Sequence, residues 1–371
     1  MRSVTDLPLS VIVPVYNGEA TIRQCLERVY GSAFRDFEVI VVDDHSTDGT
    51  AAIVRSFPCQ LICCPENLGA GAARNLGAAR ASGRVFYFLD ADILVNSDTF
   101  GQAMDALGRH PECSAIFGSF EKNTPADNFV SVYKNLLHHY THQNSNEEAA
   151  TFCGGFGAIR RDVFFEMRGF DPKCRFMEDV ELGCRLHRAG HRIRLNKQLQ
   201  VTHLKRYTFA GLIRSDVIGR AIPWTRIILD SRLIRNDLNT QVHNVVSVPV
   251  SFLLLAALVI PRLWSVLGLP LCLPAAVVLV ALNRGFLGFA WRERGFAFLT
   301  GAILMCCFGY LYSGVGAFIG WLGYVRDSLR REVPAKPQLG APDDPVEVLG
   351  NLSDVHPHVK TLLRPPTSAA R

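Results

Sequence analysis

Acidic residues occur in this sequence as close pairs, at positions where carboxylates can do chemistry. Asp90 and Asp92 stand one residue apart, directly behind the strand-forming run VFYFL. Two carboxylates on a turn after a strand suit a hard divalent cation that is held by few protein ligands together with substrate phosphates. A second pair closes the run FEVIVVDD, and a third lies in MEDVE as Glu178 and Asp179. Three such groups can serve three roles: hydrogen bonding to a nucleoside, metal binding and proton acceptance.

The elements that precede these carboxylates predict a sheet that gathers them. The run LSVIVPV at Leu9–Val15 is β-branched and apolar on both faces, which is typical of a buried parallel strand. Strands that alternate with helices predict a doubly wound α/β sheet with ligands at the carboxyl ends of its strands. The pairs at 43–44 and 90–92 fall at such ends. Similar strands are expected at 37–42, 60–64, 85–89, 114–117 and 192–195, with helices near 69–81, 97–108, 127–142 and from 162.

Several common sites are missing from the sequence. No G-x-G-x-x-G follows the first strand, which argues against a dinucleotide, and no G-x-x-x-x-G-K-[ST] occurs. A nucleotidyltransferase would carry a G-x-G-T-R segment and a lysine after the first strand, and PVYNGEAT has neither. Eleven cysteines without a C-x-x-C pair argue against a disulfide framework or a zinc site. The remaining interpretation is a nucleotide-diphosphate site in which a metal offsets most of the phosphate charge.

The C-terminal part of the sequence predicts membrane helices. It contains three uncharged stretches, at 245–261, 263–282 and 295–325. About 20 apolar residues suffice to span a membrane, so we expect two to three transmembrane helices within 241–328. The first two stretches predict a hairpin that turns near Arg262. Arg284, Arg292 and Arg294 are expected in a cytoplasmic loop. The side on which the C-terminus lies stays open, because three simple spans and the basic residues after them give opposite answers.

Basic residues precede the apolar region. The stretch 185–235 holds twelve Lys/Arg and two acidic residues. We interpret 205–240 as a basic amphipathic segment that lies against anionic lipid headgroups, with a solvated basic face as the alternative. No nucleic-acid-binding motif accompanies the charge. Residues 1–10 lack the pattern of a secretory signal, so we expect a catalytic domain at 1–240 in the cytoplasm, transmembrane helices at 241–328 and a disordered tail at 329–371.

Four ordered motifs resemble the family 2 glycosyltransferases of the GT-A fold. They are SVIVPVYNGEATIRQCL, FEVIVVDDHSTDGT, NLGAGAARNLGAARASGRVFYFLDAD, and CGGFGAIRRDVFFEMRGFD followed by MEDVELGCRLHRAG. The resemblance covers roughly residues 7–224. It implies a mixed, doubly wound sheet, a nucleotide-sugar donor, a Mn²⁺ or Mg²⁺ ion, and transfer of the sugar with inversion at the anomeric carbon.

The resemblance also implies roles for individual residues. Asp92 would bind the metal that bridges the diphosphate, and Asp90 would contact the ribose, the sugar or the same metal. Asp179 matches the general base of the family, and Glu178 flanks it. The other donor-side residues are Pro14, Tyr16 and Asp44 in the base and ribose pocket, Glu19 at its edge and Arg74 near the pyrophosphate. The acceptor-side residues are Gly154, Gly155, Arg220 and Trp224.

Each of these assignments has a structural alternative. Pro14 and Tyr16 can shape a turn, Arg74 can lie on a helix surface, and Asp179 can cap a helix. The histidines within 138–142 have metal-ligand spacing but no acidic partner nearby in the sequence.

The acceptor is predicted from the segment that comes after the general base. Relatives that polymerise and extrude a polysaccharide carry Q-x-x-R-W there, whereas RYTFAGLIRSDVIGRAIPWT has no such pentapeptide. We therefore expect a non-processive enzyme that adds one sugar to a lipid or lipid-linked acceptor at the cytoplasmic face of the inner membrane. A polyprenyl phosphate is the alternative acceptor; it is ionised and scarcely needs a base, so the Glu178-Asp179 pair favours a hydroxyl. A non-catalytic membrane scaffold would show no donor turnover, and a transporter would carry ionisable residues in its spans.

Overall fold

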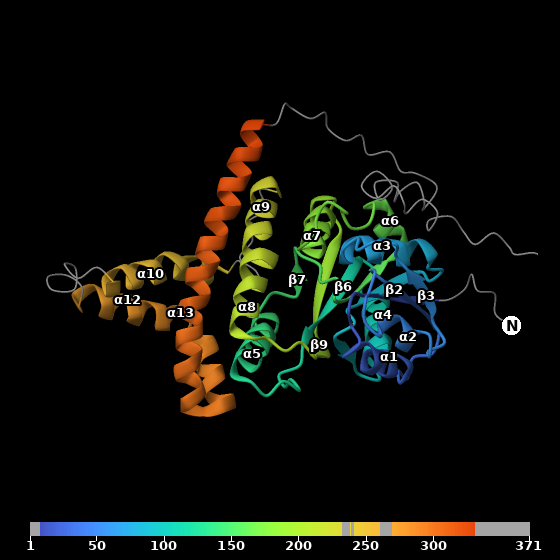
Figure 1. Cartoon of the computed structure of the whole chain (residues 1–371), viewed down its shortest axis with the longest axis horizontal. Helices are drawn as coiled ribbons and strands as arrows, with labels where there is room; N and C mark the ends of the chain where they lie inside the picture. Colours follow the sequence, from blue (N-terminus) through green and yellow to red (C-terminus); the bar gives the residue numbers. More distant parts are fainter. Residues whose placement is uncertain (1–7, 232–237, 239–240, 260–268, 331–371) are drawn as a thin grey trace, which may run out of the picture. The chain divides into compact units, whose positions relative to one another are not determined.

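The computed structural model describes residues 8–231, 238, 241–259 and 269–330 (Figure 1). These residues form two compact units. The first comprises the chain up to Glu121 together with Glu147–Lys205, and the second comprises Lys122–Asn146 and the described residues from Arg206 onwards. Residues 122–146 and those after 205 thus pack in the second unit, although the expected domain boundary lies at residue 240. The expected tail lies outside the described residues, except for 329 and 330.

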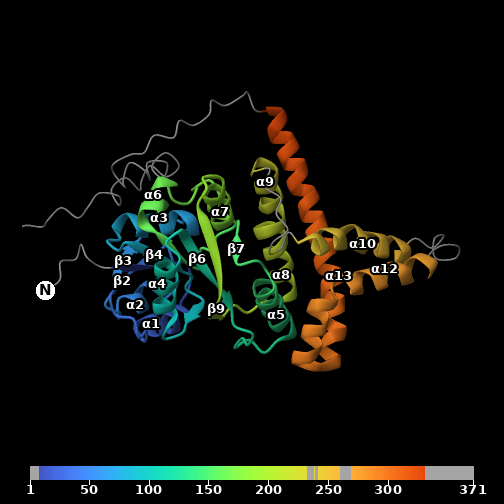
Figure 2. The ribbon, with the colours of Figure 1, turned by 180° about the vertical axis from the view of Figure 1, so that it is seen from behind.

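A mixed sheet organises the first unit (Figures 1 and 2). Within the described residues its strands are β1 (Leu9–Val15), β2 (Phe37–Asp43), β3 (Gln60–Cys63), β4 (Val85–Leu89), β5 (Ile93–Val95), β6 (Cys113–Phe120), β7 (Glu148–Ala149), β8 (Phe156–Arg160) and β9 (Arg192–His203). Their order is β3-β2-β1-β4-β8-β6-β9-β5, and β7 pairs with β9. The first four strands are parallel, whereas β8 runs antiparallel to β4 and β6. The predicted α/β fold with a mixed sheet is confirmed.

Helices cover both faces of this sheet. They are α1 (Ile22–Tyr30), α2 (Thr50–Val54), α3 (Ala70–Arg80), α4 (Thr99–Arg109), α6 (Arg161–Glu166) and α7 (Glu178–Arg188). Helices α1, α2 and α4 share a buried core with Leu9, Val11 and Val13 on one face of β1. Helix α3 packs on the opposite face, where a Cβ at Gly77 would overlap the side chain of Ile12. This alternation along β1 is the physical basis of a doubly wound sheet.

Strand β9 is longer than its sequence predicts. A short strand was expected at 192–195, whereas β9 runs over Arg192–His203. Its residues pair with β6 on one side and with β7 and then β5 on the other. The strand therefore owes its length to neighbours from distant segments rather than to its own apolar pattern, which is weak after residue 195.

The second unit is helical in the part that the structure describes. Its elements are α5 (Phe129–Gln143), α8 (Phe209–Asp216), the π-helical turn η2 (Val217–Ala221), α9 (Ile222–Ser231), α10 (Val242–Val259), α12 (Leu269–Leu282) and α13 (Arg284–Arg330). A buried core joins α5 to α13 and includes Tyr133, Leu136, Phe286, Ala290 and Met305. Residues 284–294 were expected to form a loop and are instead helical, because their apolar side chains pack into this core.

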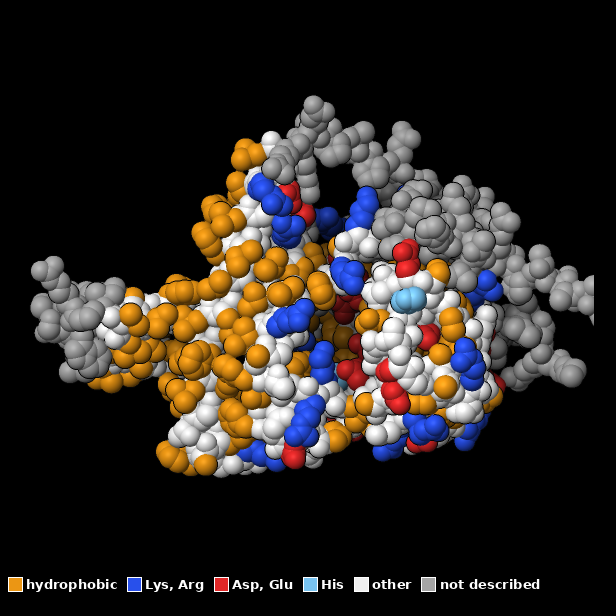
Figure 3. All heavy atoms as spheres, viewed as in Figure 1, with side chains coloured by type: hydrophobic (Ala, Val, Ile, Leu, Met, Phe, Trp, Pro, Cys, Tyr) orange, Lys and Arg blue, Asp and Glu red, His pale blue; other side chains and the backbone are white. Residues whose placement is uncertain are grey.

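Two helices of the second unit are long and apolar enough to cross a membrane, judged by length and composition alone. These stretches are Val242–Val259 and Arg284–Leu329, and Cys272–Leu282 is a shorter apolar helix. Hydrophobic side chains crowd the visible surface of α10, α12 and α13 (Figure 3). Helix α13 is interrupted at Gly295, whose φ of 80° and ψ of −176° are non-helical. The expected hairpin turn near Arg262 lies outside the described residues.

Candidate active site

Strand β1 lies where the strand order of the sheet reverses. Its pairing with β2 continues to Val15, whereas its pairing with β4 ends at Ile12. Pro14, which has no N–H to donate to a neighbouring strand, lies in the segment beyond Ile12. Open α/β sheets bind ligands in the crevice outside the carboxyl ends of strands at such a point. The acidic pairs at 43–44 and 90–92 follow β2 and β4 at this edge, as predicted.

Arg74 of α3 joins two of the acidic groups. Its Nη2 atom donates to Oδ1 of Asp90 at 2.6 Å, and Nη1 donates to Oε1 of Glu178 at 2.5 Å. The guanidinium lies over the ring of Phe170, 5.4 Å from its centroid, and the Arg74 side chain is 4% exposed. The interpretation of Arg74 as a surface arginine is therefore wrong. Its approach to a pyrophosphate stays a prediction.

Burial and pairing shift the pKa values of these three groups. Burial raises the pKa of Asp90 and of Glu178, and the positive charge of Arg74 offsets part of this rise. Burial would lower the pKa of Arg74, but the carboxylates of Asp90 and Glu178 outweigh it and hold this pKa above its ordinary value. Arg74 is thus a permanent cation that stabilises the buried carboxylate of Glu178 and the partly exposed carboxylate of Asp90.

Asp179 lies in the first turn of α7. Its Oδ2 atom accepts a hydrogen bond from the backbone N of Gly154 at 3.0 Å, and Oδ1 accepts one from the backbone N of Val180 at 2.8 Å. Helix α7 begins directly after Met177, whose φ of 61° is left-handed. Asp179 is half-buried, whereas its neighbour Glu178 is buried. Because each carboxylate oxygen has a second lone pair, Asp179 can still accept a proton.

Gly154 and Gly155, which were predicted on the acceptor side, lie beside Asp179 and Asp90, and their contact with an acceptor stays a prediction. A Cβ at Gly155 would lie 2.7 Å from Oδ2 of Asp90, and one at Gly154 would lie 3.1 Å from Cβ of Asp179. The backbone N of Asp90 also donates to the carbonyl O of Gly155 at 2.8 Å. The two carboxylates therefore approach this segment closely because glycine has no side chain.

Asp92 faces the end of strand β9. Its Oδ2 atom lies 3.4 Å from Nε2 of His203, and its carbonyl O accepts a hydrogen bond from the backbone N of Leu204 at 2.8 Å. Burial alone would raise the pKa of Asp92, but His203 and Lys205 outweigh it and lower this pKa. Neither His203 nor Lys205 was predicted, because the expected strand ended at residue 195. A strand predicted up to residue 203 would have placed both residues at this end of the sheet.

The side chains of Asp92 and His203 could bind a metal ion that a substrate also binds. No group of three or more His, Cys, Asp or Glu side chains among the described residues is arranged to hold a metal, the histidines within 138–142 included. Asp92 and His203 together offer one ionised carboxylate and one imidazole. An ion that also binds substrate phosphates needs only one or two protein ligands. Asp90, the other predicted ligand, is paired with Arg74.

Asp44 has a structural contact in addition to its predicted role. Its carboxylate oxygens accept hydrogen bonds from the backbone N of Leu68 at 2.7 Å and of Gly69 at 2.8 Å. Burial raises the pKa of Asp44, and these two bonds offset part of the rise. Gly69 has a φ of 91° and immediately precedes α3. Asp44 therefore fixes the turn that starts the helix of Arg74.

Glu19 and Tyr16 lie in the turn after β1. Oε2 of Glu19 accepts a hydrogen bond from the backbone N of Gly49 at 3.0 Å, which fastens this turn to the one before α2. The side chain of Tyr16 is exposed. An exposed aromatic ring at this edge suits stacking on a base, and the contacts of Pro14, Tyr16, Glu19 and Asp44 with a nucleotide stay predictions.

Arg220 and Trp224 do not belong to the carboxylate cluster. They lie in η2 and α9 of the second unit, where both line a cavity. The cluster in the first unit thus contains the predicted residues Arg74, Asp90, Asp92, Gly154, Gly155, Glu178 and Asp179.

Known glycosyltransferases are similar to part of this chain in sequence. Residues 10–167 match the model of the family described as "Glycosyl transferase family 2". Glycosyltransferase GlyA of Streptococcus pneumoniae is 27% identical over 224 residues, which cover 55% of this chain and 31% of GlyA. The probable glycosyltransferase YdaM of Bacillus subtilis is 30% identical over 210 residues, which cover 52% of this chain and 50% of YdaM. The chain thus spans half or less of the length of these two relatives.

A solved structure is similar over most of the chain. The mannosyltransferase PcManGT from Pyrobaculum calidifontis, determined in complex with GDP-Man and Mn²⁺, is 19% identical with a TM-score of 0.53. The similarity covers 86% of this chain and 87% of PcManGT. At this identity the likeness shows the fold, a GT-A-like mixed α/β sheet.

Proposed function

We propose that this chain, which carries a Glycosyl transferase family 2 domain at residues 10–167, is a non-processive, inverting glycosyltransferase. It transfers one sugar from a nucleotide-diphosphate sugar to a lipid or lipid-linked acceptor at the cytoplasmic face of a membrane. The observation that carries the proposal is the ion-pair chain Asp90–Arg74–Glu178, which brings the acidic turn after β4 to the start of α7. It supports a site in which a donor-binding carboxylate and a base act on one substrate.

Asp179 is the general base in this proposal. The acceptor oxygen attacks the anomeric carbon, the bond from that carbon to the diphosphate oxygen breaks, and the acceptor proton passes to the Asp179 carboxylate. A single displacement of this kind inverts the configuration. Glu178 cannot easily share the role, because its carboxylate is buried and paired with Arg74. Glu178 and Arg74 are therefore positioning residues that hold Asp179 and Asp90 in place.

Asp92 and His203 are the residues that would hold Mn²⁺ or Mg²⁺ together with the diphosphate. When bound, the ion stabilises the negative charge that develops on the departing nucleoside diphosphate. The lowered pKa of Asp92 keeps its carboxylate ionised and ready to bind a cation. The charge of Lys205 contributes to this lowering, and it would also attract the phosphates of the donor.

The donor nucleotide is proposed to bind at the edge where β1 and β4 separate. Pro14 and Tyr16 would contact the base there, and Asp44 and Glu19 hold the surrounding turns. The similarity in fold to PcManGT, a protein determined with GDP-Man and Mn²⁺, supports a nucleotide-sugar donor and a divalent cation.

The acceptor is proposed to be a lipid because two helices of the second unit are long and apolar enough to span a membrane. Their exposed hydrophobic side chains would face lipid, and the arginines at 284, 292 and 294 favour a cytoplasmic placement of that end of α13. An integral protein of the inner membrane with its catalytic domain in the cytoplasm is consistent with these features. A hydroxyl acceptor needs a base such as Asp179, whereas a polyprenyl phosphate, the second candidate, does not.

A screen of nucleotide sugars tests the proposal. The purified full chain in detergent is incubated with each donor and with Mn²⁺ or Mg²⁺, and release of the nucleoside diphosphate is measured. We expect turnover of at least one donor and a loss of about tenfold or more in Asp92→Ala, as for lost metal ligation. An Asp92→Ala variant that turns over the donor like the parent would refute the metal assignment.

The base is tested by Asp179→Asn, with Asp105→Asn on the exposed face of α4 as the matched control. The amide keeps the shape of the side chain and one of the two backbone hydrogen bonds that the carboxylate accepts, but it cannot take the proton. Donor affinity should be unchanged, while transfer to a hydroxyl acceptor should fall about 10²- to 10⁴-fold. Equal transfer by Asp179→Asn and the control would favour the phosphate acceptor instead.

A further inference from the structure

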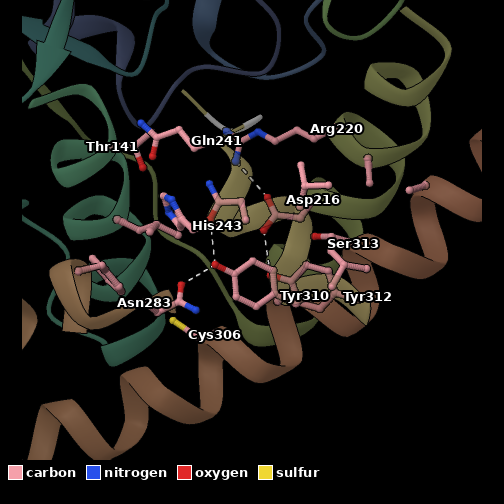
Figure 4. Close-up of a pocket in the computed structure, with 18 of the residues that line it drawn as sticks. Thr141, Asp216, Arg220, Gln241, His243, Asn283, Cys306, Tyr310, Tyr312 and Ser313 are labelled. Atoms are coloured by element: carbon pink, nitrogen blue, oxygen red, sulfur yellow. Dashed lines mark hydrogen bonds and ion pairs between the residues drawn. The ribbon is translucent and has the colours of Figure 1, made fainter. Parts of the chain in front are cut away.

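The second unit contains a cavity that the proposed chemistry does not use. Its volume is about 300 Å³, at the lower end of the range for small-molecule sites. All of its lining residues lie in the second unit (Figure 4). Most lie on α5, on the helix that runs through α8, η2 and α9, and on α10 and α13, while Gln241 directly precedes α10 and Asn283 lies between α12 and α13. The cavity therefore belongs to the second unit alone.

One wall of the cavity is a buried charged network. Both carboxylate oxygens of Asp216 accept hydrogen bonds from Nζ of Lys134 at 2.8 Å, and the two side chains are each 9% exposed. Oδ1 of Asp216 also lies 3.0 Å from Nη1 of Arg220, and its Oδ2 accepts from the hydroxyl of Tyr312 at 2.9 Å. Figure 4 shows Asp216, Arg220 and Tyr312 pointing towards one another. The network holds these side chains in fixed positions, as a built site requires.

The backbone around Arg220 is π-helical, a rare conformation. Residues Val217–Ala221 form a π-helical turn between two α-helical segments. Single π-turns inside α-helices are rare and are frequently found at functional sites. The Arg220 side chain is 33% exposed, in contrast to its buried partner Asp216. A ligand in the cavity can therefore reach Arg220.

The rest of the lining is amphipathic. Two of the three Lys, Arg, Asp and Glu side chains that line the cavity are cationic. Many further side chains of the lining can donate hydrogen bonds, among them Thr141, Thr225, Gln241, His243, Asn244 and Tyr312. Apolar side chains of the lining include Leu137, Trp224, Val245, Val248, Phe286 and Ala317. Two of the contributing helices, α10 and α13, are the ones long enough to span a membrane. A ligand that matches this lining has an anionic, hydrogen-bond-accepting head and an apolar body.

We propose that this cavity binds the phosphate-bearing head of a lipid, with Arg220 and Lys134 on its cationic wall. The planar guanidinium of Arg220 suits phosphate oxygens, and the apolar lining suits the first part of the hydrocarbon chain. The lipid phosphate belongs to an acceptor of either kind, a polyprenyl phosphate or a saccharide linked to a lipid through phosphate. The identification of this lipid as the sugar acceptor rests on the proposed function, whereas the binding itself does not.

Direct binding tests the proposal independently of sugar transfer. The full chain in detergent is titrated with a polyisoprenyl phosphate, with the matching polyisoprenol that lacks the phosphate, and with inorganic phosphate, and the ligand-bound fraction is measured by native mass spectrometry. We expect the lipid phosphate to bind at least about tenfold more tightly than either of the others. Equal affinity for inorganic phosphate would identify a site for free phosphate, and equal affinity for the alcohol would identify a neutral lipid; each result overturns the proposal.

Substitutions locate the binding. Arg220→Gln should weaken lipid-phosphate binding about tenfold or more, because a charge-assisted hydrogen bond is lost, and Arg220→Lys should restore part of it. The control Arg214→Gln removes the same charge from an exposed position on α8 and should change the affinity less than about twofold. Equal binding by Arg220→Gln and the parent, or equal loss in Arg214→Gln and Arg220→Gln, would overturn the proposal.

A variant that keeps every charge covers the case in which Arg220→Gln does not fold. Ala317→Leu places a larger apolar side chain in the cavity and should weaken binding of the lipid phosphate, while thermal unfolding checks that the variant is folded. Unchanged binding in a folded Ala317→Leu variant would overturn the location. Donor hydrolysis is measured without lipid, and lipid binding is measured without a sugar donor. Absence of donor turnover would therefore contradict the proposed function alone, and absence of lipid-phosphate binding would contradict the proposed cavity ligand alone.

Discussion

The Nη2 atom of Arg74 lies 2.6 Å from Oδ1 of Asp90, and this contact ties helix α3 to the acidic turn after β4. The other end of the same guanidinium holds Glu178, so one cation on α3 pairs with carboxylates from two other segments of the chain. A substitution of Arg74 should therefore change stability, and one of Gly155 should change turnover. A substitution of His203 should change metal binding, and one of Asp216 should change stability in acid.

Arg74→Met should reduce the free energy of unfolding by about 3 kcal/mol, because it leaves Glu178 buried without its cation. We take the lower end of the range for broken buried pairs because the Asp90 side chain is 41% exposed and can be solvated. Urea unfolding of the full chain in detergent measures the change. Arg28→Met, at an exposed position on α1, is the control and should cost less than about 0.5 kcal/mol. Equal stability of the two variants would contradict a stabilising role for the pair.

Gly155→Ala should lower activity by displacing the carboxylate of Asp90. The added Cβ would lie 2.7 Å from Oδ2 of Asp90, and Arg74 holds that carboxylate in place, so the side chain cannot simply swing away. We expect a loss of about tenfold in kcat, as for small misplacements at an active site. Gly101→Ala in α4, where an added Cβ meets no atom within 4 Å, should leave kcat unchanged. Similar kcat values for both variants would show that the close approach has no catalytic consequence.

His203→Ala should raise the Mn²⁺ concentration needed for half-maximal donor turnover. The imidazole Nε2 lies 3.4 Å from Oδ2 of Asp92, so its loss removes one candidate ligand and one contact that orients the carboxylate. A shift of about 10- to 100-fold is expected for such a change. The control His110→Ala removes an imidazole at the end of α4 and should leave the metal titration unaltered. An unaltered titration in His203→Ala would exclude His203 from metal binding.

Asp216 should make the fold sensitive to acid. Burial alone would raise its pKa, but Lys134 and Arg220 outweigh burial and lower the pKa in the folded state. A carboxyl with a lowered folded pKa contributes stability above its unfolded pKa of about 3.9, and this contribution is lost as pH falls through the folded value. The melting temperature of the parent in detergent should therefore fall more steeply below about pH 4 than that of Asp216→Asn. The exposed-site variant Asp230→Asn should keep the parent's slope. Identical slopes for the parent and Asp216→Asn would contradict the assignment.

Local sequence patterns were sufficient for the parallel half of the sheet. The apolar runs at β1, β2 and β4 predicted buried strands, because burial on both faces requires a nearly continuous apolar run. Acidic pairs at the ends of β2 and β4 were placed correctly at one edge of the sheet, because the carboxyl ends of parallel strands meet at the same side of a sheet. Strand β9 was underestimated, since its pairing partners β5, β6 and β7 supply what its own pattern lacks.

The sequence by itself determined the classes of element, the positions of the acidic pairs and the apolar stretches, because period and composition are local properties of the chain. Only the tertiary structure decided which side chains meet: Arg74 with Glu178, Asp92 with His203, and Lys134 with Asp216. Each of these contacts joins residues from separate elements, and its geometry depends on how helices and strands pack. That packing is a property of the whole fold, and no window of the sequence contains it.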